Sequence, residues 1–204
     1  PLRRSRKPPH SSDSDFRTTV GNLITEEVEQ AKQLLADAGY PNGEGLPVLT
    51  LMVTNSQENK DTAQVIQAMW KENLGVQTEI VTYEDKVYWD EHAAGNFDVA
   101  YDGWTGDYLD PDTNLNCFTQ ARVFDENRWS GEKALEYDSM IEECRNLTDN
   151  AQRMEIFAEA EKLLMEEMPI MPLYFRNTQL LVKPTVSGLE KNLLGHTMFV
   201  HASK

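Results

Sequence analysis

The chain has 204 residues, which suits one large domain or one and a half small ones, and 40% of them are apolar, enough for a substantial core. Its net charge of −15 argues against a nucleic-acid partner, because phosphate groups would be repelled. No apolar run approaches the roughly 20 residues that a helix needs to span a bilayer, and the basic N-terminus lacks the apolar stretch of a signal peptide.

Basic residues gather at the start of the chain, which is acidic elsewhere. Arg3, Arg4, Arg6 and Lys7 are four of the nineteen basic residues, whereas the chain carries thirty-four acids. We expect residues 1–24 to be a disordered or foreign basic tail and linker. A basic arm that contacts an anionic surface is the alternative interpretation.

The first predicted helix starts at Thr25, a favourable N-cap residue that Glu26 and Glu27 follow in the first turn. One apolar stripe marks its buried face and consists of Val28, Ala31, Leu35 and Ala38. Gly39 ends the helix, because glycine readily takes the left-handed conformation of a C-terminal cap.

Three strands and two helices then alternate along the chain. The strands are expected at 47–54, 76–82 and 97–103, and the helices at 58–74 and 84–93. The predicted buried face of the first of these helices consists of Ile66, Met69, Trp70 and Leu74. This β-α-β-α-β order predicts an α/β fold with a mixed, mainly parallel sheet flanked by helices.

The second half of the chain is predicted to be mainly helical. Amphipathic helices are expected at 132–145 and 149–167, and Asp149 is a plausible N-cap for the second. The core stripe of that second helix consists of Ile156, Ala160, Leu163 and Leu164. The run "IMPLYF" at 170–175 predicts another strand, after which proline and glycine residues leave the chain irregular.

The chain has two cysteines, Cys117 and Cys144, so it can form one disulfide at most. Cys144 falls on the same helix face as Tyr137, Met140 and Ile141, which is a core face. This position favours a buried free thiol over a disulfide.

The stretch "YDGWTGDYLDP" at 101–111 combines a tryptophan, two glycines and several acids at the end of a predicted strand. Ligands of open α/β sheets bind beyond the carboxyl ends of the strands, which is where Trp104 and Asp107 would lie. The indole offers a flat face for stacking, and an unpaired carboxylate suits an ammonium ion. The alternative is that Trp104 is a core residue and Asp107 caps a turn.

Metal binding and catalysis are the rival interpretations of these acids. Asp110, Asp112 and Asn114 resemble the start of an EF-hand loop, but its sixth position is Leu115 instead of glycine and its twelfth is Ala121 instead of glutamate. No nucleophile elbow, phosphate-binding loop or metal-ligand histidine spacing is present. We therefore expect no metal, cofactor or catalytic residue. A small α/β enzyme that uses Asp107 and Asp110 as acid and base is the alternative.

Five segments, in order, resemble the solute-binding proteins of peptide ABC transporters. They are "EVEQAKQLLADAGYPNGEG", "AQVIQAMWKENLGVQTEI", "AAGNFDVAYDGWTGDYLDP", "EAEKLLMEEMPIMPLYF" and "LLVKPTVSGL". The resemblance covers roughly residues 16–204 and is to the C-terminal region of the family 5 extracellular solute-binding proteins, of the oligopeptide- and dipeptide-binding type.

This resemblance implies a lobe with the periplasmic-binding-protein-like (type II) fold. Residues 25–176 would form the C-terminal ligand-binding lobe, and residues 177–204 a segment that returns toward an N-terminal lobe missing from this chain. The intact protein would capture peptides outside the cytoplasm, in the periplasm or lipid-anchored at the cell surface, and deliver them to ABC permease subunits without acting as an enzyme. Any membrane attachment would lie outside this chain. Nickel, an opine or a sugar is the alternative ligand.

The resemblance also implies a ligand site. Peptide-binding members carry a Gly-Trp-x-x-Asp pattern after this strand, in which the aspartate pairs with the peptide ammonium; here that residue is Asp107. Trp104 would line a side-chain pocket, and the backbones of Gly103 and Thr105 would hydrogen-bond an extended peptide.

The chain departs from the family pattern at other positions. Some oligopeptide binders place arginines near these positions to hold the peptide carboxylate, whereas this chain has His92 and Tyr101, which are its candidate ligand-binding residues there. A histidine seen in some members before the second helix is Asn59 here, and the basic sequence before residue 13 replaces an apolar stretch rich in glycine and proline.

Overall fold

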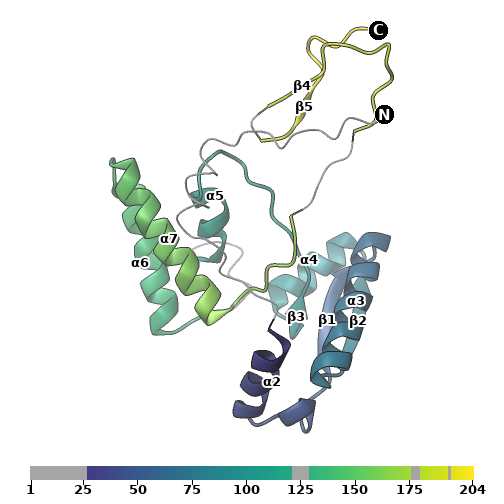
Figure 1. The fold of residues 1–204 in the computed structure, drawn as a ribbon, viewed down its shortest axis with the longest axis vertical. Helices are drawn as coiled ribbons and strands as arrows, with labels where there is room; N and C mark the ends of the chain where they lie inside the picture. Colours follow the sequence, from purple (N-terminus) through teal and green to yellow (C-terminus); the bar gives the residue numbers. More distant parts are fainter. Residues whose placement is uncertain (1–26, 121–128, 176–179, 193) are drawn as a thin grey trace. The chain divides into compact units, whose positions relative to one another are not determined.

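The computed structural model describes residues 27–120, 129–175, 180–192 and 194–204 (Figure 1). The chain divides into two compact units, Ile24–Trp104 in one and Pro1–Leu23 with Thr105–Lys204 in the other. The division at Trp104 falls inside the region 25–176 that we expect to be one lobe. The predicted tail at 1–24 and the predicted cap Thr25 lie outside the described residues.

The unit Ile24–Trp104 is built on a three-stranded parallel sheet. Its elements are α2 (Val28–Asp37), η1 (Pro41–Gly43), β1 (Leu49–Thr54), α3 (Gln57–Leu74), β2 (Thr78–Tyr83), α4 (Asp85–Ala94) and β3 (Val99–Ala100). The strand order is β2-β1-β3, and both neighbours of β1 run parallel to it. The predicted β-α-β-α-β order and parallel sheet are confirmed.

The core of this unit lies around the central strand. Leu51, Met52 and Val53 of β1 are fully buried because the strand has a neighbour on each side and helices pack against the sheet. Helix α3 packs on Leu51 and Val53 with a stripe formed by Ala63, Ile66 and Trp70. Met69 is 51% exposed, so its predicted core position is wrong. Ile66 and Trp70 are four residues apart and share one face of the helix, whereas Met69, one residue before Trp70, lies at the side of that face.

Strand β3 is much shorter than the predicted 97–103. Only Val99 and Ala100 pair with β1, after which the Tyr101 amide donates one further hydrogen bond to the Met52 carbonyl (2.9 Å). The Gly103 amide then donates to the carboxylate of the neighbouring Asp102 (2.6 Å). This local bond replaces a ladder bond, so the chain leaves the sheet before Gly103.

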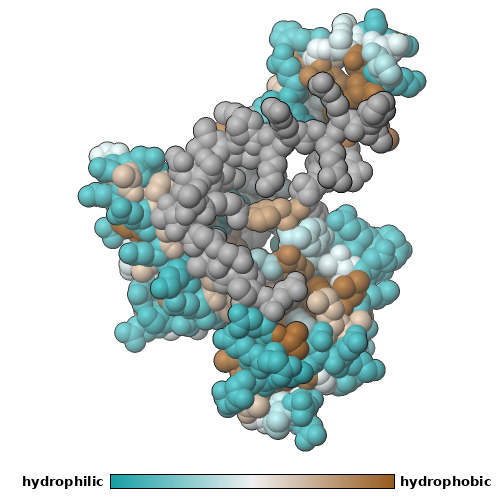
Figure 2. All heavy atoms as spheres, in the orientation of Figure 1, coloured by the Kyte–Doolittle hydropathy of each residue, from teal (hydrophilic) through white to brown (hydrophobic). Residues whose placement is uncertain are grey.

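The other unit contains a helical pair and a small hairpin. Its elements are α5 (Asp112–Leu115), η2 (Asn116–Phe118), α6 (Glu132–Asn146), α7 (Asn150–Glu167), β4 (Glu190–Lys191) and β5 (Thr197–Met198). Helices α6 and α7 lie side by side (Figure 1), and their outer faces are mostly hydrophilic (Figure 2). Asp149 is the N-cap of α7 as predicted, since its carboxylate accepts bonds from the amides of Ala151 (2.8 Å) and Gln152 (3.2 Å).

The core of the helical pair consists of Leu115, Tyr137, Ile141, Cys144, Phe157, Ala160, Leu163 and Leu164. Three of the four residues predicted for the α7 stripe are in this core, and Ile156 packs against it half-buried. Neither Cys117 nor Cys144 forms a disulfide and both are buried, as predicted for Cys144. Burial raises the pKa of the Cys144 thiol to about 11, so this thiol is protonated at neutral pH.

The C-terminal part of the chain corrects two predictions. Residues 171–175 carry no regular secondary structure, so the strand predicted at 170–175 is wrong, because an apolar run becomes a strand only where a neighbouring strand completes its ladder. The antiparallel strands β4 and β5 form in the segment expected to be irregular. Across the described ranges, no helix is both long and apolar enough to cross a membrane.

Candidate functional site

The predicted ligand-binding residues fall on both sides of the division between the units. Gly103 and Trp104 end one unit, and Thr105 and Asp107 begin the other. Different hydrogen bonds hold the residues before and after this division, and they determine which side chains and backbone groups are exposed.

In the first half, Tyr101 anchors the chain where it leaves the sheet. Its ring is buried, its amide donates to the Met52 carbonyl, and its own carbonyl accepts a hydrogen bond from the Tyr88 hydroxyl on α4 (2.8 Å). Trp104 follows three residues later and is 40% exposed, which excludes the alternative of a fully buried core tryptophan. Tyr101 thus holds the strand end from which the chain continues to Gly103 and Trp104.

Polar side chains near the carboxyl ends of β1 and β2 form hydrogen bonds with one another. The Asn59 side chain donates to the Thr54 hydroxyl (2.7 Å), and the Asn55 side chain donates to the Glu84 carboxylate (2.6 Å). The Ser56 hydroxyl caps α3 by accepting from the Asn59 amide (3.2 Å). Asn59 therefore has a structural role at this edge.

His92 lies in an aromatic cluster on α4. Its ring stacks on Phe97 (centroids 5.0 Å apart, planes at 22°) and meets Trp89 edge to face (5.5 Å, 65°). Tyr88 of the same helix belongs to this cluster, with its ring centroid 5.6 Å from that of His92, and its hydroxyl donates to the Tyr101 carbonyl just after β3. A role for His92 in ligand binding stays a prediction.

In the second half, Asp107 begins a loop that leads into α5. Its amide donates to the Thr113 hydroxyl (2.9 Å), which fixes the backbone. Its carboxylate is exposed and forms no ion pair or hydrogen bond with any residue that the structure describes. An exposed carboxylate on a fixed backbone is suited to a cationic ligand group.

The carboxylates of the next two acids, Asp110 and Asp112, accept hydrogen bonds from other side chains of the protein. Both terminal nitrogens of Arg153 bind Asp110, with N–O distances of 2.9 and 3.1 Å. Asp112 accepts from the Tyr108 hydroxyl (2.6 Å), the Asn116 amide group (2.8 Å) and Arg145 Nε (3.2 Å). The acid–base alternative that needs Asp110 is therefore disfavoured, since Arg153 holds that carboxylate.

Asp112 is stabilised in its ionised form. Burial alone would raise the pKa of its carboxyl group, but the hydrogen bonds from Tyr108 and Asn116 and the charge of Arg145 outweigh burial and lower that pKa below its ordinary value. Within the described part of the chain, no group of three or more His, Cys, Asp or Glu side chains is placed to hold a metal ion. The charges of Asp110 and Asp112 thus serve the loop itself.

The sequence did not predict the two arginines that form salt bridges with Asp110 and Asp112. Arg145 lies 33 residues from Asp112, and Arg153 lies 43 residues from Asp110. The only available signal was three acids within six residues without a neighbouring cation, which indicates that cations must come from elsewhere in the fold.

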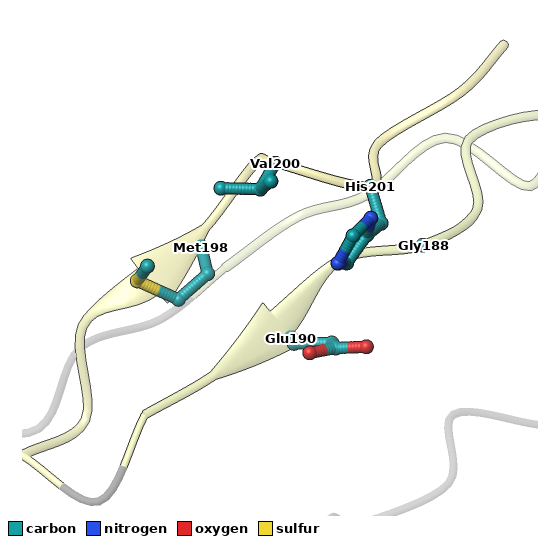
Figure 3. Close-up of a pocket in the computed structure, with 5 residues that line it drawn as sticks. All are labelled: Gly188, Glu190, Met198, Val200 and His201. Atoms are coloured by element: carbon teal, nitrogen blue, oxygen red, sulfur yellow. The ribbon is translucent and has the colours of Figure 1, made fainter.

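Two hollows lie in the unit that contains Asp107. One is open and is lined by Asp107, Tyr108, Leu109, Lys191, Asn192 and Leu194. The other lies on the β4–β5 hairpin (Figure 3) and is lined by Gly188, Glu190, Met198, Val200 and His201. The first hollow combines the Asp107 carboxylate with the apolar side chains of Leu109 and Leu194 and with the ammonium group of Lys191.

Comparisons with known proteins give the chain its relatives. Residues 5–125 match the family described as bacterial extracellular solute-binding proteins, family 5 middle. The dipeptide-binding protein DppE of Bacillus subtilis (strain 168) is 31% identical over 191 residues, which are 93% of this chain and 35% of DppE. The periplasmic oligopeptide-binding protein OppA of Escherichia coli (strain K12) is 35% identical over 160 residues, which are 78% of this chain and 29% of OppA.

A solved structure agrees with these sequence matches. The crystal structure of a periplasmic oligopeptide-binding protein/oligopeptide ABC transporter (OppAIV) from Borrelia burgdorferi is similar with a TM-score of 0.67 at 35% identity, over 73% of this chain and 30% of that one. The predicted periplasmic-binding-protein-like (type II) fold is confirmed. The chain spans about a third of the length of the relatives it matches. It belongs to the family 5 bacterial extracellular solute-binding proteins.

Proposed function

We propose that this chain is part of the substrate-binding component of an ABC importer that captures peptides, with Asp107 as the partner of the peptide ammonium group. One observation carries the proposal: of the acids in the 107–112 loop, Asp107 is exposed and uncommitted among the described residues, whereas Asp110 and Asp112 are held by arginines. Trp104, Gly103 and Thr105 of the same short stretch are the further residues that we propose to contact the peptide.

The names of the relatives support peptides over the alternative ligands. Those reported above are described as a dipeptide-binding protein, an oligopeptide-binding protein and an oligopeptide ABC transporter. Nickel, an opine or a sugar has no such support. The proposed protein is a binding protein without catalytic activity, and it works outside the cytoplasm with permease subunits as partners.

The C-terminal segment supports a further part of the proposal. Leu181 is 96% exposed and Val200 is 76% exposed, and Phe199 lies beside Val200 in the same segment and is also exposed. Such large apolar side chains mark a surface that another protein element covers. We assign that cover to the N-terminal lobe of the intact protein, toward which residues 177–204 would return.

The test uses the intact binding protein and alanine peptides of two to five residues, each with a free or an N-acetylated terminus. Calorimetry should show binding of the free peptides, and Asp107→Asn should weaken it about tenfold or more, because a hydrogen bond to a charged group contributes about 1.5–3 kcal/mol. N-acetylated peptides should bind poorly and should respond little to the substitution.

The matched control is Glu159→Gln, which removes one exposed acid from α7 without touching the loop. It should leave all affinities unchanged. If no free peptide binds, or if Asp107→Asn binds free peptides as tightly as the unchanged protein, the proposed function or the role of Asp107 is wrong.

A further inference from the structure

We propose that Arg153 is a positioning residue that holds the loop 107–113 in the conformation that presents the Asp107 carboxylate. This inference rests on the proposed function, because it assigns a support to the residue that would bind the peptide amine. Arg153 would act through Asp110 and would not touch the peptide.

Two hydrogen bonds between backbone groups are described within the loop 107–113. The Asp110 amide donates to the Tyr108 carbonyl (3.1 Å), and the Thr113 amide donates to the Asp110 carbonyl (3.2 Å). Helix α5 is a single turn of four residues, Asp112–Leu115. A helix this short has little stability alone, so the loop depends on contacts with longer elements.

Arg153 supplies such a contact from a long helix. Its terminal nitrogens bind both oxygens of Asp110, its Nε donates to the Cys144 carbonyl at the end of α6 (2.8 Å), and its guanidinium lies 5.1 Å from the centre of the Phe157 ring. The contacts with Cys144 of α6 and Phe157 of α7 thus orient the guanidinium plane independently of its bonds to the loop. A lysine could not reproduce this geometry, because its ammonium lacks the planar fork.

The support continues from Asp110 to Asp107 through hydrogen bonds. Asp110 Oδ1, which Arg153 holds, also accepts from the Asp112 amide (3.0 Å) and so fixes the start of α5. The next residue, Thr113, is buried and accepts from the Asp107 amide. Gly106 lies so close that an added Cβ would be 3.0 Å from Thr113 Cγ2. Each link is a direct contact between the residues named.

Charge gives the second reason for this role. Asp107, Asp110 and Asp112 lie within six residues and repel one another unless they are compensated. Arg153 and Arg145 compensate the last two, which leaves the charge of Asp107 in excess at this loop. Losing Arg153 would both free the loop and restore the repulsion between Asp107 and Asp110.

The experiment compares Arg153→Lys and Asp110→Asn with the control Lys162→Gln in the intact protein. Lys162 lies on the same helix and pairs only with the exposed Glu166, at 3.7 Å, among the contacts described for it. Hydrogen exchange of residues 105–113 without ligand measures the order of the loop, and residues 132–146 of α6 serve as the internal reference. Calorimetry then gives the ratio of affinities for free and N-acetylated trialanine. Asp110→Asn keeps the side-chain shape, so it tests the inference even where Arg153→Lys does not fold.

We expect exchange at 105–113 to rise about tenfold or more in Arg153→Lys and Asp110→Asn, with α6 unchanged, and the preference for the free amine to fall about as far as in Asp107→Asn. The control should match the unchanged protein in both measurements. Unchanged exchange at 105–113, or a mobile loop with an intact amine preference, would overturn the positioning role while Asp107→Asn still tests the proposed function. If no trialanine binds to the unchanged protein, the proposed function fails and this inference fails with it.

Discussion

Three aspartates of the same short loop have different roles because they have different donors. Asp107 has its amide bound and its carboxylate exposed, Asp110 meets a guanidinium, and Asp112 meets a phenol, an amide group and a second guanidinium. The sequence shows three equivalent acids. Neighbouring side chains decide which of these carboxylates pairs with an arginine of the protein and which stays exposed.

The first prediction at this scale concerns Asp112. Its folded-state pKa is lowered, so its contribution to stability is present above the unfolded-state pKa of about 3.9 and is lost as the pH falls through the lower folded-state value. Asp112→Asn should therefore reduce the free energy of unfolding at pH 7, because the amide cannot pair with Arg145. The difference should narrow below pH ~4, where the Asp112 carboxyl group of the unfolded chain becomes protonated while that of the folded chain is still ionised.

Urea unfolding at pH 7, 4 and 3, followed by tryptophan fluorescence, measures this difference. Glu159→Gln is the control, since its exposed side chain should change stability little at any of these pH values. A gap between Asp112→Asn and the unchanged chain that is as wide at pH 3 as at pH 7 would contradict the assigned cause.

At the scale of elements, the end of α3 shows a close approach between two backbones. Gly75 caps α3 with a φ of +72°, and Gly43 of the turn η1 has a φ of +75°. A Cβ at Gly43 would lie 2.7 Å from the Gly75 carbonyl carbon, and a Cβ at Gly75 would collide with the Asn42 carbonyl oxygen. The turn that follows α2 thus packs directly on the cap of α3.

Gly75→Ala should therefore cost more stability than Gly39→Ala. Gly39 also has a positive φ, +94°, but an added Cβ there would meet open space. Gly39→Ala should cost about 1–2 kcal/mol from the left-handed conformation alone, and Gly75→Ala should cost that amount plus the backbone shift that the Asn42 carbonyl requires. Urea unfolding of both variants separates the two contributions. Equal losses would show that the collision is relieved without cost.

Local patterns predicted the elements well where the elements are long. Helices α3, α6 and α7 were predicted to within a residue or two at their ends, because hydrophobic periodicity and capping residues are local signals. The strand expected at 170–175 and the length of β3 were wrong, because strand pairing depends on a neighbour that the local sequence does not contain.

The candidate site was predictable to the same extent. The end of a strand places Trp104 and Asp107 where ligands of α/β sheets bind, which is a local signal. The pairing of Arg153 with Asp110 joins residues 43 apart, and neither residue carries a pattern that names the other. The sequence therefore suffices to propose Asp107 as the binding group, which stays a prediction, whereas the contact between Arg153 and Asp110 could not be predicted from it.

At the scale of the whole molecule, the chain supplies only part of the proposed binding site. It spans about a third of the length of its relatives, and its C-terminal segment exposes large apolar side chains such as Leu181. Ligand sites of high affinity bury most of the ligand surface. The proposed lobe offers one carboxylate, one half-exposed indole and a few backbone groups, so most of the enclosure must come from the rest of the protein.

This division predicts how tightly the isolated 204-residue chain binds peptides. An exposed ion pair contributes about 0–1 kcal/mol and a net hydrogen bond about 0.5–1.5 kcal/mol, while association costs at least ~4 kcal/mol in lost freedom. The isolated chain should therefore bind trialanine no better than roughly millimolar, whereas the intact protein should bind it far more tightly. Calorimetry on both proteins measures the difference, and circular dichroism first establishes that the isolated chain is folded. A micromolar dissociation constant for the folded, isolated chain would mean that these residues form a nearly complete site, and the proposed sharing of contacts with the rest of the protein would be wrong.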